Sequence, residues 1–110
     1  MHTQPDLVVV LVTAGSTEEA QGIATSLVEE RLAACVNIVG PVESVYRWEG
    51  KVQRDQERLL VIKARSSSFD RLAERVRELH SYDTPEVIAL PIVAGSEAYL
   101  KWLQASTKAD

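Results

Sequence analysis

Apolar residues recur along the chain with two different spacings, and each change of spacing marks a boundary between predicted elements. Residues 7–12 are an unbroken apolar run, which is typical of a buried strand. Beyond this run the apolar positions return every three or four residues, which predicts an amphipathic helix over residues 17–33. Ser16 and Glu19 form a capping box at its start, because each side chain can accept a hydrogen bond from the backbone N–H of the other.

The centre of the chain predicts a long β-hairpin. A second strand covers residues 35–48, with a bulge or bend expected at the Gly-Pro pair of residues 40–41. The Glu-Gly pair at 49–50 indicates a tight turn, and a third strand follows over residues 51–65. Fully extended, each arm would be on the order of 45 Å long, whereas a compact domain of this size is on the order of 35 Å across. The hairpin must therefore bend sharply at residues 40–41 or project beyond its own core.

The last third of the chain predicts three further elements. They are a helix that carries Phe69, Leu72, Val76 and Leu79 after the N-cap serines of residues 66–68, a strand over residues 87–90 that follows a turn at residues 83–85, and a short helix after Gly95-Ser96. The complete order is β-α-β-β-α-β with an additional C-terminal helix. This is the ferredoxin-like plan, an α/β fold of the α+β sandwich type. We expect residues 1–110 to form one such domain.

The predicted sheet is apolar on both faces. In the ferredoxin-like plan both main helices cover the same face, so the opposite face of a monomer should be polar. Successive residues of a strand point to opposite faces, and both sets are apolar in three strands: Leu7, Val9 and Leu11 against Val8, Val10 and Val12; Leu59 and Val61 against Leu60 and Ile62; Val87 and Ala89 against Ile88 and Leu90. Monomers rarely expose large apolar patches, so we expect a homo-oligomer in which the hairpin tip, with Tyr46 and Trp48, packs on a neighbouring copy. The alternative is a monomer with a bent hairpin.

Charge excludes one class of partner. The net charge is −4, and a nucleic-acid-binding protein should instead concentrate positive charge on one face. The basic residues of the predicted second helix, Arg71, Arg75 and Arg77, are interspersed with Glu74 and Glu78. That mixture is typical of a solvated helix face with ion pairs three residues apart. We therefore expect no nucleic-acid partner.

Nothing in the sequence indicates a membrane or an oxidising compartment. The apolar run of residues 7–12 is too short for a membrane span or a signal sequence, and residues 1–6 have no cationic stretch or cleavage site. Cys35 is the only cysteine, which excludes an internal disulfide. We expect a cytoplasmic protein without a membrane partner, whose core folds without a structural metal.

Three residues carry chemistry that can bind a metal: Cys35, His80 and Glu86. A thiolate and an imidazole suit copper or zinc, and a carboxylate can complete the coordination. All three lie at junctions between predicted elements, which can converge at one end of the sheet or at a cleft between subunits. Each also has a structural alternative, because a lone cysteine often only packs, a histidine at a helix C-terminus is favoured by the helix dipole, and Glu86 can pair with an arginine.

Two other interpretations of these residues are weaker. Cys35, His80 and Asp83 are the residue types of a nucleophile, a base and an orienting group, but no local feature activates the thiol, so we do not expect an enzyme. His2, beside a free amino terminus, can chelate copper by itself. Copper binding alone would therefore not establish a functional site.

Four stretches together resemble the CutA divalent-cation tolerance family. They are residues 28–37 (VEERLAACVN), 46–51 (YRWEGK), 80–86 (HSYDTPE) and 99–103 (YLKWL). The resemblance covers nearly the whole chain, and the combination of motifs at these spacings is specific. Ser81 stands where proline is frequent in the family, and Asp83 where glutamate is frequent; a changed turn there would alter how His80 points.

The resemblance implies a homotrimer of ferredoxin-like subunits, similar in architecture to the PII signalling proteins. It also implies a role in divalent-cation tolerance, with copper as the candidate cofactor and other divalent cations as further candidates. We expect a homotrimeric metal tolerance or response protein that binds metal or a small ligand near its intersubunit clefts. The alternative is a PII-like trimeric signalling or scaffold module that acts through protein–protein contacts with an unknown partner.

Overall fold

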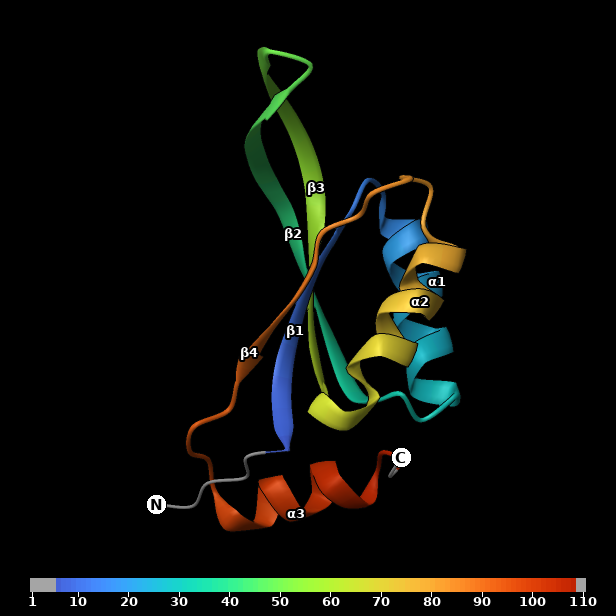
Figure 1. Cartoon of the computed structure of the whole chain (residues 1–110), viewed down its shortest axis with the longest axis vertical. Coiled ribbons are helices and arrows are strands. Elements are labelled where there is room, and N and C mark those ends of the chain that lie inside the picture. The colour runs from blue at the N-terminus through green and yellow to red at the C-terminus, as the bar shows by residue number, and fades with distance from the viewer. Residues whose placement is uncertain (1–5, 109–110) are drawn as a thin grey trace.

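The computed structural model describes residues 6–108, which form a four-stranded antiparallel sheet with two helices on one face and a third helix at one end (Figure 1). The elements in chain order are β1 (Leu7–Ala14), α1 (Thr17–Glu29), β2 (Ala33–Trp48), β3 (Lys51–Arg65), a 3-10 turn (Ser66–Ser68), α2 (Phe69–Leu79), β4 (Val87–Pro91) and α3 (Glu97–Ala105). The strand order is β2-β3-β1-β4. This arrangement confirms the predicted ferredoxin-like plan with an additional C-terminal helix. None of the helices in residues 6–108 has the length and apolar character needed to cross a bilayer.

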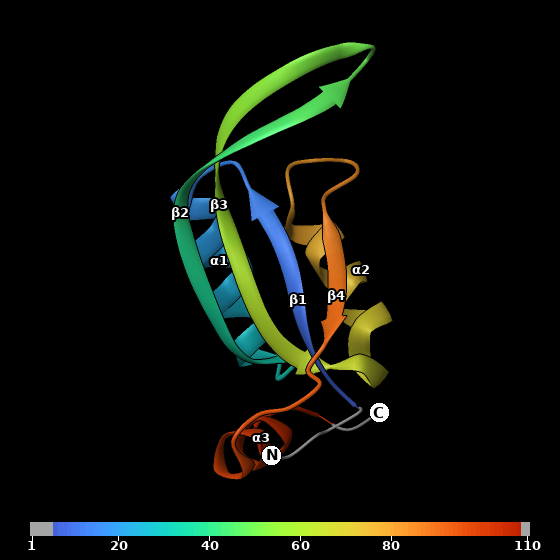
Figure 2. The same cartoon turned by 90° about the vertical axis from the view of Figure 1, so that its left-hand side faces the viewer.

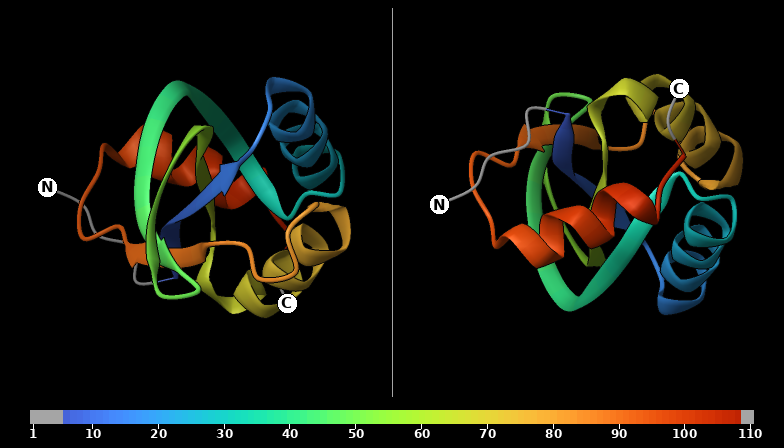
Figure 3. Two further views of the ribbon diagram at one scale, coloured as in Figure 1. Left: turned by 90° about the horizontal axis from the view of Figure 1, so that it is seen from above. Right: turned by 90° about the horizontal axis from the view of Figure 1, so that it is seen from below.

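The main core lies between the sheet and the helices α1 and α2. Val10 of β1 pairs with Ile62 of β3, and both side chains are fully buried in the same cluster as Leu27 of α1 and Leu72 of α2. Complete burial of each such side chain contributes on the order of 1.5–3 kcal/mol. A smaller cluster lies under α3, which crosses one end of the sheet (Figure 3).

Helix α1 ends four residues earlier than the apolar pattern predicts, so the expected helix over residues 17–33 is wrong at its C-terminus. The backbone N–H of Leu32 donates to Leu27 O and that of Arg31 donates to Val28 O, which closes the helix as a Schellman motif. Arg31 occupies the left-handed position of this motif with φ 61°. Leu32 is nevertheless buried, so its apolar position continues the helical spacing in the sequence beyond the residue at which the helix ends.

The β2–β3 hairpin changes register and also projects beyond the core. The register of β2 against β3 shifts between Val39 and Val42, as the Gly-Pro pair predicted. A Cβ atom on Gly40 would lie 2.3 Å from Cδ of Arg58, so any larger residue there would force the Arg58 side chain to shift from its path over β2. Beyond this point the paired strands extend away from the helices, and the molecule measures 44 × 27 × 21 Å (Figure 1).

The sheet face opposite α1 and α2 is uncovered along most of its length. In Figure 2 this face is turned toward the viewer with α1 and α2 behind it, and within residues 6–108 only α3 lies near one end. Ile88 and Leu90 of β4 are each 49% exposed on this face, and Val39 of β2 is 46% exposed. The predicted two-sided apolar sheet is therefore present.

Candidate functional site

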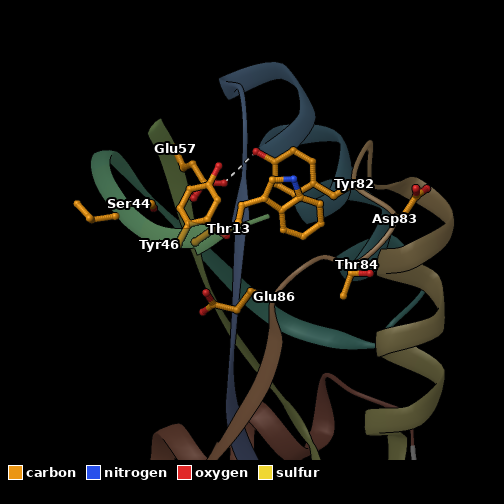
Figure 4. Close-up of a pocket in the computed structure, with 10 residues that line it drawn as sticks. Thr13, Ser44, Tyr46, Glu57, Tyr82, Asp83, Thr84 and Glu86 are labelled. Carbon is orange, nitrogen blue, oxygen red and sulfur yellow. Dashed lines mark hydrogen bonds between the residues drawn. The ribbon is translucent and has the colours of Figure 1, made fainter. Parts of the chain in front are cut away.

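A pocket lies where the β2–β3 hairpin leaves the sheet (Figure 4). Its volume is about 550 Å³, and it is lined by the end of β1, the hairpin from Glu57 at its base to Trp48 next to its tip, and the loop that joins α2 to β4. The lining residues are Thr13, Ser44, Val45, Tyr46, Trp48, Glu57, Tyr82, Asp83, Thr84 and Glu86. Aromatic and acidic side chains therefore dominate its wall.

Glu57 is the most buried charged group of this pocket. The residue is only 6% exposed, and its Oε2 accepts a hydrogen bond from the hydroxyl of Tyr82 at 3.0 Å. Figure 4 shows the two side chains reaching toward each other from opposite walls. Burial and the hydrogen bond to Glu57 raise the pKa of Tyr82 to about 12, so the hydroxyl stays protonated and donates.

His80 lies beneath the pocket and holds Tyr82 in place. Its side chain is fully buried, with Nε2 2.7 Å from the carbonyl oxygen of Thr13 and Nδ1 3.0 Å from the backbone nitrogen of Tyr82. These partners require Nε2 to donate and Nδ1 to accept, which fixes a neutral tautomer. The imidazole also contacts the Tyr82 ring, with 4.6 Å between centroids. Both ring nitrogens are therefore already used within the chain.

Glu19 links the first helix to the loop after His80. The hydroxyl of Ser16 accepts a hydrogen bond from the Glu19 backbone, as the capping box predicts. The Glu19 carboxylate, however, accepts from the backbone nitrogens of Gly15 at 3.3 Å and Ser81 at 2.8 Å. Burial raises the pKa of Glu19, but these hydrogen bonds outweigh it and hold the pKa below its usual value.

Cys35 lies apart from this pocket. It faces the open side of the sheet, half-buried, with Asn37 Oδ1 4.0 Å from its sulfur. Strand pairing aligns Cys35 with Lys63 of β3, which in turn pairs with Val9 of β1. Val9 is four residues from Thr13 along β1, which corresponds to about 13 Å. The thiol is thus at the α3 end of the sheet and His80 is at the hairpin end.

The structure brings two of the three predicted metal donors to the same region and leaves the third elsewhere. Glu86 lines the pocket and is exposed, whereas His80 lies behind the wall and Cys35 is distant. Among residues 6–108, no group of three His, Cys, Asp or Glu side chains is placed to hold a metal ion. A metal site that uses these donors would need side chains from more than one copy, and the assignment remains a prediction.

Glu57 and Tyr82 are not among the site residues that the sequence predicts. Glu57 stands in the mostly polar first half of its strand, and nothing local distinguishes it from an exposed strand residue. Tyr82 lies within the 80–86 motif, whose histidine and carboxylates are the residue types that suggest metal chemistry. The two side chains are 25 residues apart and meet only through the tertiary fold.

Comparison with known proteins decides the family. The sequence profile of the CutA1 divalent ion tolerance protein family matches residues 8–106. The chain belongs to this family. It is 54% identical over 99 residues to the divalent-cation tolerance protein CutA of Thermus thermophilus, covering 90% of this chain and 96% of that protein. It is 56% identical over 101 residues to the chloroplastic protein CutA of Arabidopsis thaliana, covering 92% of this chain but only 56% of that longer protein.

Solved structures of the family have the same fold. The CutA1 structure from Oryza sativa superposes with a TM-score of 0.94 at 52% identity, covering 99% of this chain and all of that chain. The structure from Thermus thermophilus gives a TM-score of 0.91 at 53% identity, covering 93% of this chain and 99% of that chain. The CutA resemblance of the four motifs is thereby confirmed. Relatives named chloroplastic and periplasmic leave the cytoplasmic location of this chain a prediction.

Proposed function

We propose that this CutA1-family chain acts as a homotrimer that binds a divalent metal, copper in particular, or a small ligand in clefts between its subunits. In this role it contributes to divalent-cation tolerance, the property for which its relatives are named. The observation that carries the proposal is the uncovered apolar face of the sheet, which continues to the rim of the pocket. The number of three subunits follows from the family resemblance.

The open face has the composition of a subunit interface. Ile88 and Leu90 are half-exposed, and Val9, Leu11 and Val61 beside them are only partly covered. An apolar sheet face of this kind is stable in water only when another surface covers it. Because Thr13 and Glu57 belong to the same face, a subunit that covers the apolar part would also form a wall of the pocket.

Metal binding in such a cleft would draw on accessible donors from different copies. Glu86 is exposed and Cys35 is half-buried, so either can reach a metal without unfolding. His80 would first have to give up its contacts with Thr13 and Tyr82. A thiolate with nitrogen or oxygen donors favours copper among divalent first-row metals.

Calorimetric copper titrations of the whole chain test this site. Every variant carries His2→Ala, because an N-terminal chelate would otherwise mask the result. We expect Cys35→Ser combined with His80→Ala to lower copper affinity, and Cys35→Ser and Glu86→Gln each to lower it alone. Glu74→Gln, an exposed carboxylate on α2, is the control and should leave affinity unchanged. Unchanged affinity in all of the first three variants would remove these residues as ligands.

A second function, a PII-like signalling or scaffold module without catalytic activity, is supported by the projecting hairpin. Trp48 is 58% exposed and Val52 is 60% exposed near its tip, where they present apolar surface to a partner protein. Thermal unfolding across metals and small metabolites separates the two functions. Selective stabilisation by copper supports the metal role, and selective stabilisation by a metabolite supports the signalling role.

A further inference from the structure

We propose that the pocket at the base of the hairpin binds a small organic ammonium cation, held by the Glu57 carboxylate and by the faces of the aromatic residues around it. This goes beyond the metal role, because it assigns a specific class of small ligand to a pocket whose charged and aromatic lining comes from one chain, even where a neighbouring copy adds a further wall. The argument rests on three features of the pocket: its charge, its aromatic surface and its size.

The charge of the pocket is exclusively negative. Glu57, Asp83 and Glu86 line it, and its described lining contains no Lys, Arg or His. Glu57 is more than nine-tenths buried, and Tyr82 supplies its Oε2 with a neutral hydrogen bond rather than a positive charge. A buried carboxylate without a counter-charge is costly, so a cation that enters the pocket gains a strong partner.

Nearby arginines do not supply that charge, because each is held elsewhere. Arg58 Nε donates to the hydroxyl of Thr17 at 3.0 Å on the helical side of the sheet. Arg54 lies 3.9 Å from Glu43 on the exposed part of the hairpin, and Arg47 donates to the carbonyl of Gly50 at its tip. The pocket therefore remains open to an external cation.

Three aromatic residues make the lining suitable for an organic cation rather than a bare metal ion. They are Tyr46 and Trp48, both from β2, and Tyr82 from the opposite loop. The hydroxyl of Tyr46 donates to Asp55 and that of Tyr82 donates to Glu57. Because His80 contacts the Tyr82 ring, the exposed aromatic surface for a ligand comes mainly from Tyr46 and Trp48. Aromatic faces attract alkylammonium groups, whereas hard metal ions need several oxygen ligands. An anion would be repelled by the carboxylates.

The size of the pocket agrees with a small organic molecule. Sites for such ligands have volumes of roughly 300–1,000 Å³ and combine apolar walls with a few polar groups. The pocket, at about 550 Å³, falls within this range. Its apolar wall comes largely from Trp48, Tyr46 and Val45, and its one deeply buried charge is Glu57.

Choline and its uncharged carbon analogue, 3,3-dimethyl-1-butanol, provide the test, since they differ in charge but hardly in shape. Both are titrated into the full-length protein in the presence of a chelator, with binding followed by calorimetry and by NMR shifts of the Trp48 indole. We expect choline to bind at least about tenfold more tightly than the uncharged analogue. Glu57→Gln should weaken choline binding at least about tenfold, and Trp48→Leu should weaken it as well. Glu43→Gln, an exposed hairpin carboxylate outside the pocket, should leave it unchanged.

Three outcomes would overturn the proposal. They are equal affinity for choline and the uncharged analogue, no detectable choline binding, and unchanged affinity in both folded variants. Trp48 is largely exposed, so Trp48→Leu keeps the test valid even if Glu57→Gln fails to fold. If choline does not bind and Glu57→Gln instead changes the oligomer mass, a basic side chain of a neighbouring copy occupies the pocket and the proposal is wrong.

Discussion

The hydrogen bond from Tyr82 to Glu57 shows how single residues hold the candidate site together. Glu57 is buried on β3, and Tyr82 lies in the loop before β4, so the bond ties the hairpin to the α2–β4 loop. His80 supports Tyr82 from below through its backbone and its ring. The three side chains therefore act as one unit, whose loss should loosen the pocket wall.

Tyr82→Phe should destabilise the protein by about 1–2 kcal/mol, because it removes a hydrogen bond from a buried carboxylate. Tyr46→Phe is the matched control. It removes the same hydroxyl from the more exposed pair of Tyr46 and Asp55, where water replaces the lost bond, so its effect should be clearly smaller. Urea unfolding at one fixed protein concentration measures both. Equal losses would show that the buried pair has no special role.

Glu19 makes stability depend on pH. Its folded pKa is held below the value of about 4.5 expected for the unfolded chain, so its contribution is present above that pH. The contribution is lost as the pH falls through the lowered folded pKa. We expect Glu19→Gln to be less stable than the natural chain at neutral pH and the difference to shrink below about pH 4.5. A difference that stayed constant across acid titrations of unfolding would contradict this account.

Among the structural elements, the β2–β3 hairpin determines both the shape of the molecule and the position of the pocket. Its strands pair from Ala33 to Trp48 on one side and from Lys51 to Ala64 on the other, and the register shifts near the start of β2 and again at Gly40. At that point Arg58 crosses over the glycine and reaches Thr17 of α1. The hairpin is thereby anchored to the helical layer where it leaves the sheet.

Gly40→Ala should destabilise the protein by about 1–3 kcal/mol, because its methyl group would overlap Arg58 and displace the bond to Thr17. Gly22→Ala is the opposite case. Gly22 lies inside α1, and a Cβ there meets nothing within 4 Å, so alanine should stabilise by about 0.5–1 kcal/mol. Thermal unfolding should show a lower melting temperature for Gly40→Ala and a higher one for Gly22→Ala than for the natural chain. Placing Gly40→Ala in an Arg58→Ala background should reduce its cost.

The elements could be predicted from the sequence because burial imposes a spacing on them, whereas the site depends on contacts between distant residues. The unbroken apolar run in β1 and the helical spacing in α1 were sufficient to locate both. The spacing failed only at Leu32, which is buried by the turn after α1 rather than by the helix itself. His80 reaches Thr13 across 67 positions, and no local pattern reveals that its ring is fully occupied.

At the scale of the whole molecule, the two faces of the sheet differ in how they are covered. One face forms the core with α1 and α2, and the other is apolar but uncovered except near α3 (Figure 2). The pocket lies at the hairpin end of the uncovered face, and Cys35 lies toward its other end. Covering this face with neighbouring copies would bring donors and pocket walls from different subunits together, which a single chain does not achieve.

Ile88→Glu tests this arrangement directly. A charge in the middle of the uncovered face would be buried without a partner in an oligomer, so we expect the variant to dissociate to the single-chain mass of 12.2 kDa. Val28→Glu is the matched control, because Val28 is similarly exposed, at 41%, but lies on α1 away from that face. Light scattering at micromolar concentration should give the mass of a trimer for the natural chain and for Val28→Glu. A 12.2 kDa particle for the natural chain itself would mean that the open face is stable alone, and the intersubunit clefts would not exist.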